Sequence, residues 1–240
     1  MFSFFSSSRT PVKVPFRTDM HSHLIPGIDD GVKSNEQALV TIQKMMDLGY
    51  EKFVTTPHIM SDTYPNTAED IRARAVELNN FLRSRHVDVE VVAAAEYYLD
   101  EYTMQVVGDD EPLMTFGSNY LLFETNYLSE PFILKEFIFK ATSKGLKPVL
   151  AHPERYQYMT MQKAQDLADR GVLLQLNLLS LSGFYGKPVQ KFAVKLIENK
   201  MISFIGSDCH NELQAKEMEK AIRTNAFKKA IDLPLLNSTL

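Results

Sequence analysis

Cysteine is almost absent from this chain of 240 residues, because Cys209 is the only one. A single thiol cannot form an internal disulfide, which excludes the small disulfide-bonded scaffolds of secreted proteins. Long apolar runs are also missing, since none approaches the roughly 18 residues that a membrane-spanning helix needs. The first residues carry neither the basic segment nor the continuous apolar segment of a signal peptide. We therefore expect a soluble cytoplasmic protein with no membrane span.

The chain also lacks a surplus of positive charge. It contains 26 Lys and Arg against 30 Asp and Glu, which gives a formal net charge of -4. Nucleic-acid-binding domains usually carry a basic surplus, so we expect no nucleic-acid partner. Hydrophobic residues make up 45% of the sequence, which is enough to bury the core of one large domain.

What the sequence does contain is a regular alternation of short apolar segments and amphipathic segments. The apolar segments predict strands at 52–58, 89–98, 120–125, 147–154, 172–177 and 202–210, with a first strand before His21. The amphipathic segments predict helices at 67–85, 131–145, 161–171, 189–200 and 212–227, and a first helix after Ser34 that ends at Gly49. Such alternation is typical of an α/β protein with a parallel sheet.

The strand segments favour a closed sheet. VVAAA (91–95) and VLLQL (172–176) are apolar without strict alternation, as in strands that are covered on both faces. With about seven strand–helix units and no long connection, a (β/α) barrel is the best prediction, and an open doubly wound sheet is the alternative. No G-x-G-x-x-G motif follows the first strand, which disfavours a dinucleotide-binding fold.

Histidines and acids follow most of these strands at the carboxyl end, where barrels build their active sites. These residues are His21, His23, His58, Glu96, Glu124, His152, Asp208 and His210. Singly, each histidine is explained by ordinary hydrogen bonding, and Glu96 or Glu124 by helix capping. Together they predict a metal site, because buried carboxylates without partners are costly. His86 lies in a helix-to-strand loop and is expected at the surface.

These side chains offer imidazole nitrogen and carboxylate oxygen without thiolate. That donor set suits Zn, Mn or Fe in a catalytic site rather than a structural zinc site. Eight such side chains exceed what one ion can use, so we expect two or three ions, with Glu96 as a candidate bridge. Clustered ions suit the hydrolysis of phosphate esters, because they lower the pKa of water and neutralise charge on the phosphate.

Six stretches of the chain resemble the motifs of the polymerase-and-histidinol-phosphatase (PHP) superfamily. They are DMHSH, TTPH, AAAEYY, LLFET, LAHPERY and IGSDCH, which run in order from about residue 18 to residue 211. The stretch HSHLIPGIDDGVKS (21–34) is similar to the first motif of the superfamily's bacterial protein-tyrosine phosphatase branch, which is found with capsule and exopolysaccharide operons. HSHLIPGIDDG and AHPERY are the specific matches, and the other four are informative only as a set.

The resemblance implies a distorted seven-stranded (β/α) barrel of PHP type over residues 18–240, preceded by an N-terminal extension (1–17) that we expect to be flexible. It also implies a centre of three metal ions, with Mn expected and Fe, Zn or Co as alternatives. By position, the first ion would be held by His21, His23, Glu96 and Asp208. The second would be held by Glu96, Glu124 and His152, and the third by Asp30, His58 and His210. Asp29 is the less favoured neighbour of Asp30.

The resemblance also gives Arg155 the role of a phosphate clamp, since a guanidinium group binds phosphate bidentately. The alternative is an ion pair of Arg155 with Glu154 at the surface. The family places a second arginine shortly after the last D-x-H motif, but here Lys216 is the nearest cation. Tyr127 and Tyr156 are candidates for stacking on a substrate ring or, equally, for packing.

The implied activity is that of a metal-dependent phosphatase acting on phosphotyrosine in proteins. Its expected partner is a membrane tyrosine autokinase that controls capsule or exopolysaccharide export. The alternative is a small-molecule phosphatase of the histidinol-phosphate type, which would share the metal site, whereas the acidic balance disfavours an exonuclease. A cysteine-based tyrosine phosphatase is excluded, because its arginine would have to stand at position 215, which is Ala215.

Overall fold

The computed structural model describes residues 12–109 and 112–240. Its strands are β1 (Thr18–Asp19), β2 (Lys52–Thr55), β3 (His58–Ile59), β4 (Glu90–Ala93), β5 (Glu96–Tyr98), β6 (Tyr120–Glu124), β7 (Lys147–Ala151), β8 (Leu173–Asn177) and β9 (Phe204–Gly206). Its α-helices are α1 (Asn35–Asp47), α2 (Ala68–Ser84), α3 (Glu101–Gly108), α4 (Leu134–Ser143), α5 (Met161–Asp169), α6 (Lys187–Glu198), α7 (Glu212–Ile222) and α8 (Asn225–Ile231). Three short 3-10 helices are η1 (Pro153–Arg155), η2 (Leu178–Ser182) and η3 (Leu236–Thr239).

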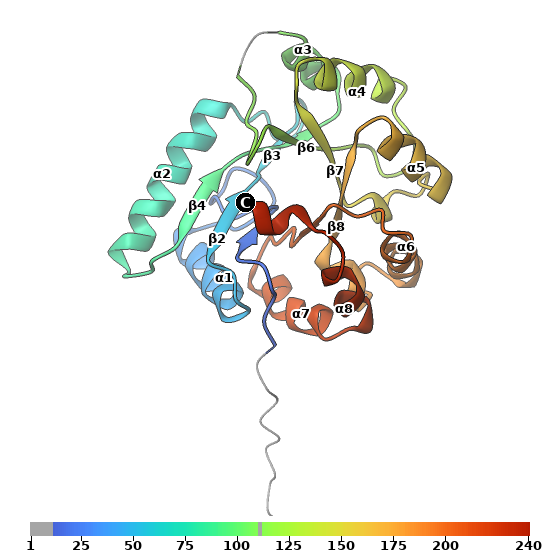
Figure 1. The fold of residues 1–240 in the computed structure, drawn as a ribbon. Helices are drawn as coiled ribbons and strands as arrows, with labels where there is room; N and C mark the ends of the chain where they lie inside the picture. The colour runs from blue at the N-terminus through green and yellow to red at the C-terminus, as the bar shows by residue number, and fades with distance from the viewer. Residues whose placement is uncertain (1–11, 110–111) are drawn as a thin grey trace, which may run out of the picture.

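The strands pair in parallel and surround a central axis, with the helices outside them (Figure 1). β1, β2 and β4 form one sheet, and β3, β5, β6, β7, β8 and β9 form the other. β2 runs on into β3, and β4 runs on into β5, after breaks of two residues each. The nine segments of the described chain therefore occupy seven strand positions. This is the distorted seven-stranded (β/α) barrel that the sequence predicts.

The barrel closes where the end of β1 meets the end of β9. Ser22 and Cys209 form a parallel bridge just beyond the two strands. The buried carboxylate of Asp19 accepts hydrogen bonds from the backbone N–H of Ser207 at 2.9 Å and from its hydroxyl at 2.7 Å. This seam joins the first strand to the last, and it brings together the polar residues that follow each of them.

Apolar side chains form one cluster inside the barrel and a larger one between the barrel and the helices. Successive strand residues point to opposite faces, so β2, β6, β7 and β9 contribute to both clusters. The inner cluster includes Met20, Val54, Leu122, Val149 and Phe204. Their sequence neighbours Phe53, Leu121 and Ile205 belong to the outer cluster with the helices. Strands covered on both faces account for the near-continuous apolar segments of the sequence.

The helices follow the predicted pattern with two differences. Ser34 caps α1 as expected. The sequence does not predict α3, which begins because the Asp100 carboxylate accepts a hydrogen bond from the Thr103 N–H at 2.8 Å. The single helix predicted at 212–227 is wrong, because the Thr224 side chain caps a separate helix, α8, by accepting from the Phe227 N–H at 3.1 Å. In the part of the chain that the structure describes, no helix is long and apolar enough to cross a membrane.

The C-terminal segment covers the amino end of the barrel, opposite the strand-end histidines, and its terminus lies over the centre of the ring in Figure 1. Asn237 accepts from the Ile205 N–H at 2.9 Å and donates to the Ile205 carbonyl at 2.8 Å. Leu236 and Leu240 pack against the inner apolar cluster, and the Thr18 hydroxyl donates to the Leu240 carbonyl at 3.1 Å. The last residues therefore close the bottom of the barrel.

The expected N-terminal extension (1–17) lies partly outside the described residues, which begin at residue 12. Within them, Val14 and Phe16 are buried, with 6% and 5% of their surface exposed. The Val14 N–H donates to the Leu48 carbonyl at 2.9 Å, just beyond the end of α1. Residues 12–17 therefore belong to the folded body, which starts earlier in the chain than the sequence predicts.

Replacing Asn237 by alanine should destabilise the barrel. Asn237→Ala leaves the buried N–H and carbonyl of Ile205 without their partners, so we expect the free energy of unfolding to fall by about 1–3 kcal/mol in urea denaturation. Ser238→Ala alters an exposed neighbour in the same 3-10 helix and should change it by less than about 0.5 kcal/mol. An Asn237→Ala protein as stable as its parent would show that the C-terminal segment does not brace the barrel.

Candidate metal centre

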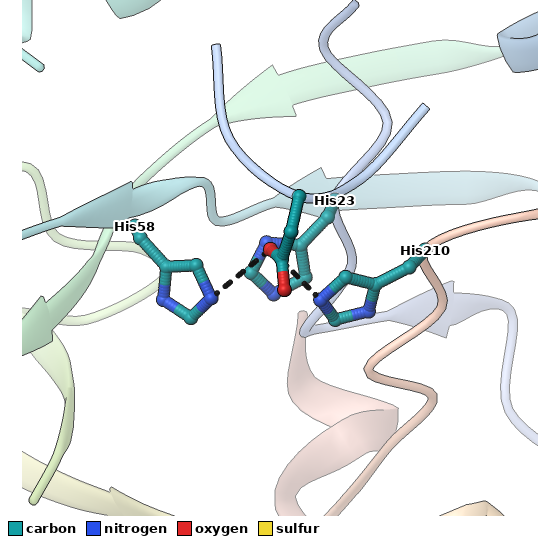
Figure 2. Close-up of side chains that lie close together, drawn as sticks. His23, His58 and His210 are labelled. Carbon is teal, nitrogen blue, oxygen red and sulfur yellow. Dashed lines mark ion pairs between the residues drawn. The ribbon is translucent and has the colours of Figure 1, made fainter. Parts of the chain in front are cut away.

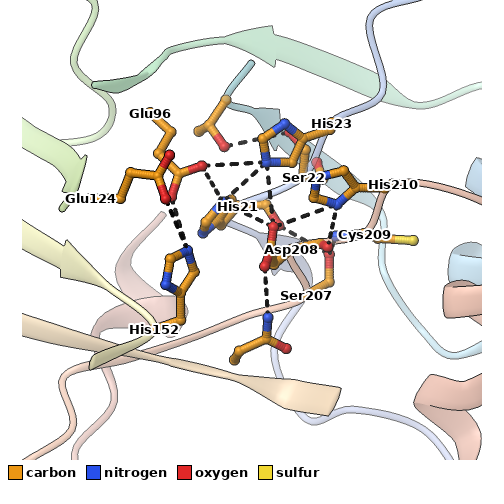
Figure 3. A network of polar contacts seen from close by, with 12 residues as sticks. His21, Ser22, His23, Glu96, Glu124, His152, Ser207, Asp208, Cys209 and His210 are labelled. Carbon is orange, nitrogen blue, oxygen red and sulfur yellow. Dashed lines mark hydrogen bonds and ion pairs between the residues drawn. The ribbon is translucent and has the colours of Figure 1, made fainter. Parts of the chain in front are cut away.

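The strand ends bring the predicted ligands together at the carboxyl end of the barrel. The ligands come from the loops after β1, β7 and β9 and from β3, β5 and β6 themselves. Figure 3 shows the side chains of His21, Glu96 and Asp208 turned toward a common centre. All nine expected ligands belong to this cluster: His21, His23, Asp30, His58, Glu96, Glu124, His152, Asp208 and His210. His86 is exposed in its loop, as predicted.

Four overlapping sets within this cluster have the geometry to hold a cation. In each set, one nitrogen or oxygen atom from every member lies within 4.8 Å of the others. The sets are His23–Asp30–His58–His210, His21–His23–Asp208, His21–Glu96–His152 and His58–Glu96–Glu124. Because the sets share members, neighbouring cations would share ligands.

The carboxylate of Glu96 lies in the middle of the cluster and is fully buried. Its Oε2 is 3.2 Å from His21 Nε2 and 3.2 Å from His58 Nδ1. The same oxygen is 3.5 Å from His23 Nε2, and Oε1 is 3.1 Å from His152 Nε2. One carboxylate thus contacts four histidines from three strand ends, which is the arrangement that a bridging ligand requires.

Asp30 occupies the more exposed side of the cluster. Its Oδ1 lies 3.4 Å from His58 Nε2 and 3.3 Å from His210 Nε2. The dashed lines in Figure 2 mark these two ion pairs, and the His23 ring lies between the rings of His58 and His210. The rings of His23 and His210 are stacked, with centroids 4.0 Å apart. The Asp30 side chain is 52% exposed, so this set is the most exposed of the four.

Two side chains outside the four sets hold the first pair of histidines in position. Asp29 Oδ2 accepts from His23 Nδ1 at 2.8 Å, and Gln175 Oε1 accepts from His21 Nδ1 at 2.9 Å. Each bond leaves Nε2 of the histidine facing the cluster, as partners of metal-binding histidines commonly do. Gly31 follows in the DDG motif because a Cβ there would lie 2.3 Å from the His23 carbonyl oxygen. Asp29 therefore orients a candidate ligand.

The close contacts between imidazoles and carboxylates shift their pKa values. Burial by itself would lower the pKa of His58, but the neighbouring carboxylates of Asp30 and Glu124 raise it to about 10. Burial would raise the pKa values of Glu96 and Asp208, yet the surrounding histidines hold both well below their usual range. The two buried carboxylates are therefore charged at neutral pH and supply the negative charge that a cation needs.

Buried polar atoms in the cluster are left without hydrogen bonds. Glu96 Oε2 and His58 Nδ1 lie 3.2 Å apart, but neither makes a hydrogen bond. An unpaired buried polar group costs about 1–3 kcal/mol, and a cation would remove that cost. The donors are nitrogen and oxygen, since the Cys209 thiol points away from the cluster and donates to the Asn211 carbonyl at 3.4 Å (Figure 3). The residues present therefore fit divalent metal ions.

Two candidate ligands also have a strained backbone. His152 and Asp208 have φ angles of 35° and 50°, in the left-handed region that residues with a side chain disfavour. Hydrogen bonds hold both in place: the Asp208 N–H donates to the His21 carbonyl at 2.8 Å, and the His152 N–H donates to Gln175 Oε1 at 3.3 Å. Strain of this kind is concentrated at functional sites, where the surrounding structure maintains it.

A cavity of about 300 Å³ opens beside the cluster. It is lined by Asp30, His58, Tyr127, His152, Arg155, Tyr185, Asp208, His210, Asn211 and Gln214. Arg155 Nη1 donates to Asp208 Oδ2 at 2.8 Å, so its guanidinium lies against the cluster. The Tyr127 ring stacks on His152, with centroids 5.9 Å apart. The cavity thus combines candidate metal ligands, one guanidinium group and two tyrosine rings.

Two of the predicted substrate contacts lie away from this cavity. Lys216 does not line it and pairs instead with Glu212 on α7, at 2.7 Å. Tyr156 is only 3% exposed, and its hydroxyl accepts from the Thr125 N–H at 3.3 Å. Packing explains Tyr156, and a solvated ion pair along the helix explains Lys216. Of the predicted contacts, Arg155 and Tyr127 are the two that reach the cavity.

The alternative partner of Arg155, Glu154, is engaged elsewhere. Glu154 is 3% exposed, and its Oε1 accepts from the Asn177 N–H at 2.9 Å and from the Ser180 hydroxyl at 2.6 Å. Burial raises the pKa of this carboxyl group. The ion pair of Arg155 is therefore with Asp208, in the site, and not with Glu154 at the surface.

Five residues that contact the candidate ligands or line the cavity are not predicted from the sequence: Gln175, Asn177, Tyr185, Asn211 and Gln214. Gln175 and Asn177 are fully buried polar residues on β8, and they share one face of the strand. Two polar residues at this spacing in an otherwise apolar strand are the signal that would have found them. Tyr185 stands in the stretch GFYG between η2 and α6, where two aromatic residues are flanked by glycines.

The chain resembles known proteins along most of its length. Residues 17–232 match the family model described as capsular polysaccharide synthesis, CpsB/CapC. The chain belongs to the CpsB/CapC family. It is 27% identical over 195 residues to the tyrosine-protein phosphatase YwqE of Bacillus subtilis (strain 168), a match that covers 80% of this chain and 77% of that protein. It is 26% identical over 214 residues to the putative tyrosine-protein phosphatase CapC of Staphylococcus aureus, covering 88% and 84%.

A solved structure has the same fold as this CpsB/CapC family member. It comes from a crystallographic study of YwqE from Bacillus subtilis and CpsB from Streptococcus pneumoniae, which are described as unique metal-dependent tyrosine phosphatases. The two chains align with a TM-score of 0.78 at 24% identity, over 92% of this chain and 94% of the other. The likeness supports the barrel architecture.

Removing the charge that orients His23 should weaken metal binding without unfolding the protein. We expect Asp29→Asn to lower the affinity for Mn²⁺ by about 10–100-fold, measured by calorimetric titration of metal-stripped protein. Asp62→Asn, which changes an exposed acid outside the four sets, is the matched control and should bind Mn²⁺ like the parent. An Asp29→Asn protein with parental affinity and an unchanged circular dichroism spectrum would contradict the orienting role.

Proposed function

We propose that this protein is a metal-dependent phosphatase that removes phosphate from phosphotyrosine in proteins. One observation carries the proposal: nine nitrogen- and oxygen-donor side chains converge beside a cavity whose lining includes the guanidinium of Arg155. Cations and a guanidinium group are the partners that a phosphate ester dianion needs. Membership of the CpsB/CapC family, and relatives that are named tyrosine-protein phosphatases, support the same activity.

We further propose that the cluster holds three divalent ions, with Mn as the expected metal and Fe, Zn or Co as alternatives. The first would be held by His21, His23, Glu96 and Asp208, the second by Glu96, Glu124 and His152, and the third by Asp30, His58 and His210. The sets His21–His23–Asp208 and His23–Asp30–His58–His210 support the first and third assignments, and Glu96 is common to the other two sets. Bound there, the ions would lower the pKa of water and neutralise charge on the phosphate.

Arg155 is the proposed clamp for the phosphate oxygens. Its Nη1 is bound to Asp208 Oδ2, which leaves the other N–H groups of the fork for the substrate. The other oxygen of the same carboxylate, Asp208 Oδ1, lies 3.4 Å from His21 Nε2 and 3.4 Å from His23 Nε2. Asp208 therefore fixes the guanidinium beside the metal cluster. A phosphate held by Arg155 would have its oxygens at the edge of the cluster.

The surroundings of the cavity suit an aryl phosphate carried by a protein. Tyr127 lines the cavity and is 36% exposed, so its ring is available to stack on the phenyl ring of phosphotyrosine. We propose that the substrate is the phosphorylated tail of a membrane tyrosine autokinase, reached from the cytoplasm. The description of the family as one of capsular polysaccharide synthesis supports a role in capsule or exopolysaccharide export.

Substrate and metal dependence can be tested together. We expect the protein with Mn²⁺ to release phosphate from a phosphotyrosine peptide at a higher kcat/KM than from histidinol phosphate, to leave single-stranded DNA intact, and to lose its activity with chelator. The readouts are released phosphate and, for DNA, fragment length. Faster hydrolysis of histidinol phosphate than of the peptide would instead indicate a small-molecule phosphatase. Activity that resists chelation would contradict the metal site.

The charge of Glu96 should be indispensable. Glu96→Gln keeps the shape of the side chain but removes the charge that faces four histidines, so we expect kcat on the phosphotyrosine peptide to fall by more than about 100-fold, together with the bound metal. Cys209→Ser is the matched control in the same region, because the thiol faces away and burial raises its pKa. We expect Cys209→Ser to remain active. Full turnover by a folded Glu96→Gln protein would contradict the mechanism.

A further inference from the structure

The guanidinium of Arg155 is held by more than its ion pair. Its central carbon lies 4.4 Å from the centroid of the Tyr185 ring and 5.0 Å from that of the Tyr127 ring. A cation within about 6 Å of an aromatic ring face is attracted to it, and the attraction is stronger where water is excluded. The Arg155 side chain is 23% exposed, so most of it is shielded from solvent. Tyr185 makes the closer of the two contacts.

Tyr185 also contacts the residue that shares Asp208 with Arg155. Asn177 Nδ2 donates to the Tyr185 hydroxyl at 3.2 Å and to Asp208 Oδ2 at 2.8 Å. Arg155 Nη1 donates to that same oxygen. The four side chains therefore form a closed circuit in which Tyr185 touches Arg155 through its ring and Asn177 through its hydroxyl. The circuit is built on Asp208, a candidate ligand of the first ion.

The backbone around Tyr185 is shaped to place its ring in the cavity. Gly183 ends η2 with a φ of 82°, and Gly186 precedes α6 with a φ of 96°. Both values lie in a region that glycine adopts without steric cost. The Gly186 N–H donates to the Gly183 carbonyl at 2.9 Å, which closes the turn. Tyr185 consequently lines the cavity, whereas its neighbour Phe184 is 43% exposed and does not.

Orientation of Arg155 matters because it is the single lysine or arginine among the described residues that line the cavity. Lys216, the cation nearest to the position of a second arginine in the sequence, lies outside. A guanidinium group binds phosphate well only when its planar fork faces the oxygens, and a free arginine side chain samples many rotamers. A site with one such group therefore gains affinity from whatever holds it in place.

We propose that Tyr185 is a positioning residue that holds the guanidinium of Arg155 in its phosphate-binding orientation. The inference rests on the proposed function, because it assigns Tyr185 a role in binding the phosphate group at that same site. Most of the restraint on the guanidinium comes from the ring face of Tyr185, which contacts Arg155 directly. A smaller share comes from the Tyr185 hydroxyl, which holds Asn177 and thereby the Asp208 oxygen to which Arg155 donates.

Binding of inorganic phosphate to the Mn²⁺-loaded full chain, measured by calorimetry, tests this role apart from turnover. Tyr185→Leu removes the π face and should raise the Kd of phosphate about tenfold. Tyr185→Phe keeps the ring and should raise it only about threefold, through loss of the hydroxyl contact. Phe184→Leu changes the neighbouring exposed ring in the same turn and should bind phosphate within about twofold of the parent. Metal content and Tm should stay at parental values in all three.

A double-mutant cycle with Arg155→Met then separates positioning from a direct role. If Tyr185 acts through Arg155, Tyr185→Leu should change the Kd of phosphate by less than about twofold once the guanidinium is gone, because effects on one shared group do not add. In kinetics with the phosphotyrosine peptide, a positioning role predicts that Tyr185→Leu raises KM more than it lowers kcat.

The possible failures can be told apart. A parent protein that binds phosphate but does not hydrolyse the phosphotyrosine peptide would overturn the proposed function. If the parent is active and its Tyr185→Leu variant binds phosphate as tightly as the parent does, the positioning role is overturned. It is also overturned if Arg155→Met and Tyr185→Leu raise the Kd of phosphate independently, so that the double variant shows the product of the two changes. Loss of bound metal in Tyr185→Leu would also overturn it, because Tyr185 would then be supporting the cluster instead of Arg155.

Discussion

The rest of the structure depends on the buried charge of Glu96. Its carboxylate is fully buried and lies within 3.5 Å of nitrogen atoms from four histidines. A buried charge without partners would cost many kcal/mol or would neutralise itself by taking up a proton. Here the parallel barrel stabilises the charge, because three of its strand ends place histidines around the Glu96 carboxylate. The seam between Asp19 and Ser207 holds the first and last strands together, so that the histidines after β1 meet Asp208.

Asp208 connects this charged centre to the substrate side of the site. Its Oδ1 faces His21 and His23, and its Oδ2 accepts from Arg155 and Asn177. The group that we propose binds phosphate and the histidines that we propose bind metal therefore contact different oxygens of one carboxylate. The positive φ of Asp208 is maintained by the hydrogen bond from its N–H to the His21 carbonyl. The aromatic ring of Tyr185 lies within the same circuit of contacts.

Much of this arrangement can be predicted from the sequence, and the remainder has a physical reason for being hidden. Alternation of apolar segments with helices predicts the barrel, and the histidines and acids at strand ends predict the cluster. The role of Asp29 as an orienting group is not visible in the DDG motif, because adjacent acids are equivalent until the backbone turns one of them toward His23. Tyr185 and Asn177 join the site through contacts with Arg155 and Asp208, which belong to other segments of the chain. Lys216 pairs instead with Glu212, one helical turn before it. The helix α3 is not predicted because its 8 residues are too few to show a clear apolar stripe, although Asp100 caps it.

Anomalous X-ray diffraction from crystals grown with Mn²⁺ is the most direct test of whether the strand-end side chains bind metal as one cluster. Data collected near the manganese absorption edge locate the ions without reference to activity. We expect anomalous peaks within the four sets of side chains, with Glu96 in contact with more than one ion and Asp29 and Gln175 in contact with none. Crystals of active protein in which Mn²⁺ lies elsewhere, while Glu96 remains surrounded only by histidines, would contradict this expectation.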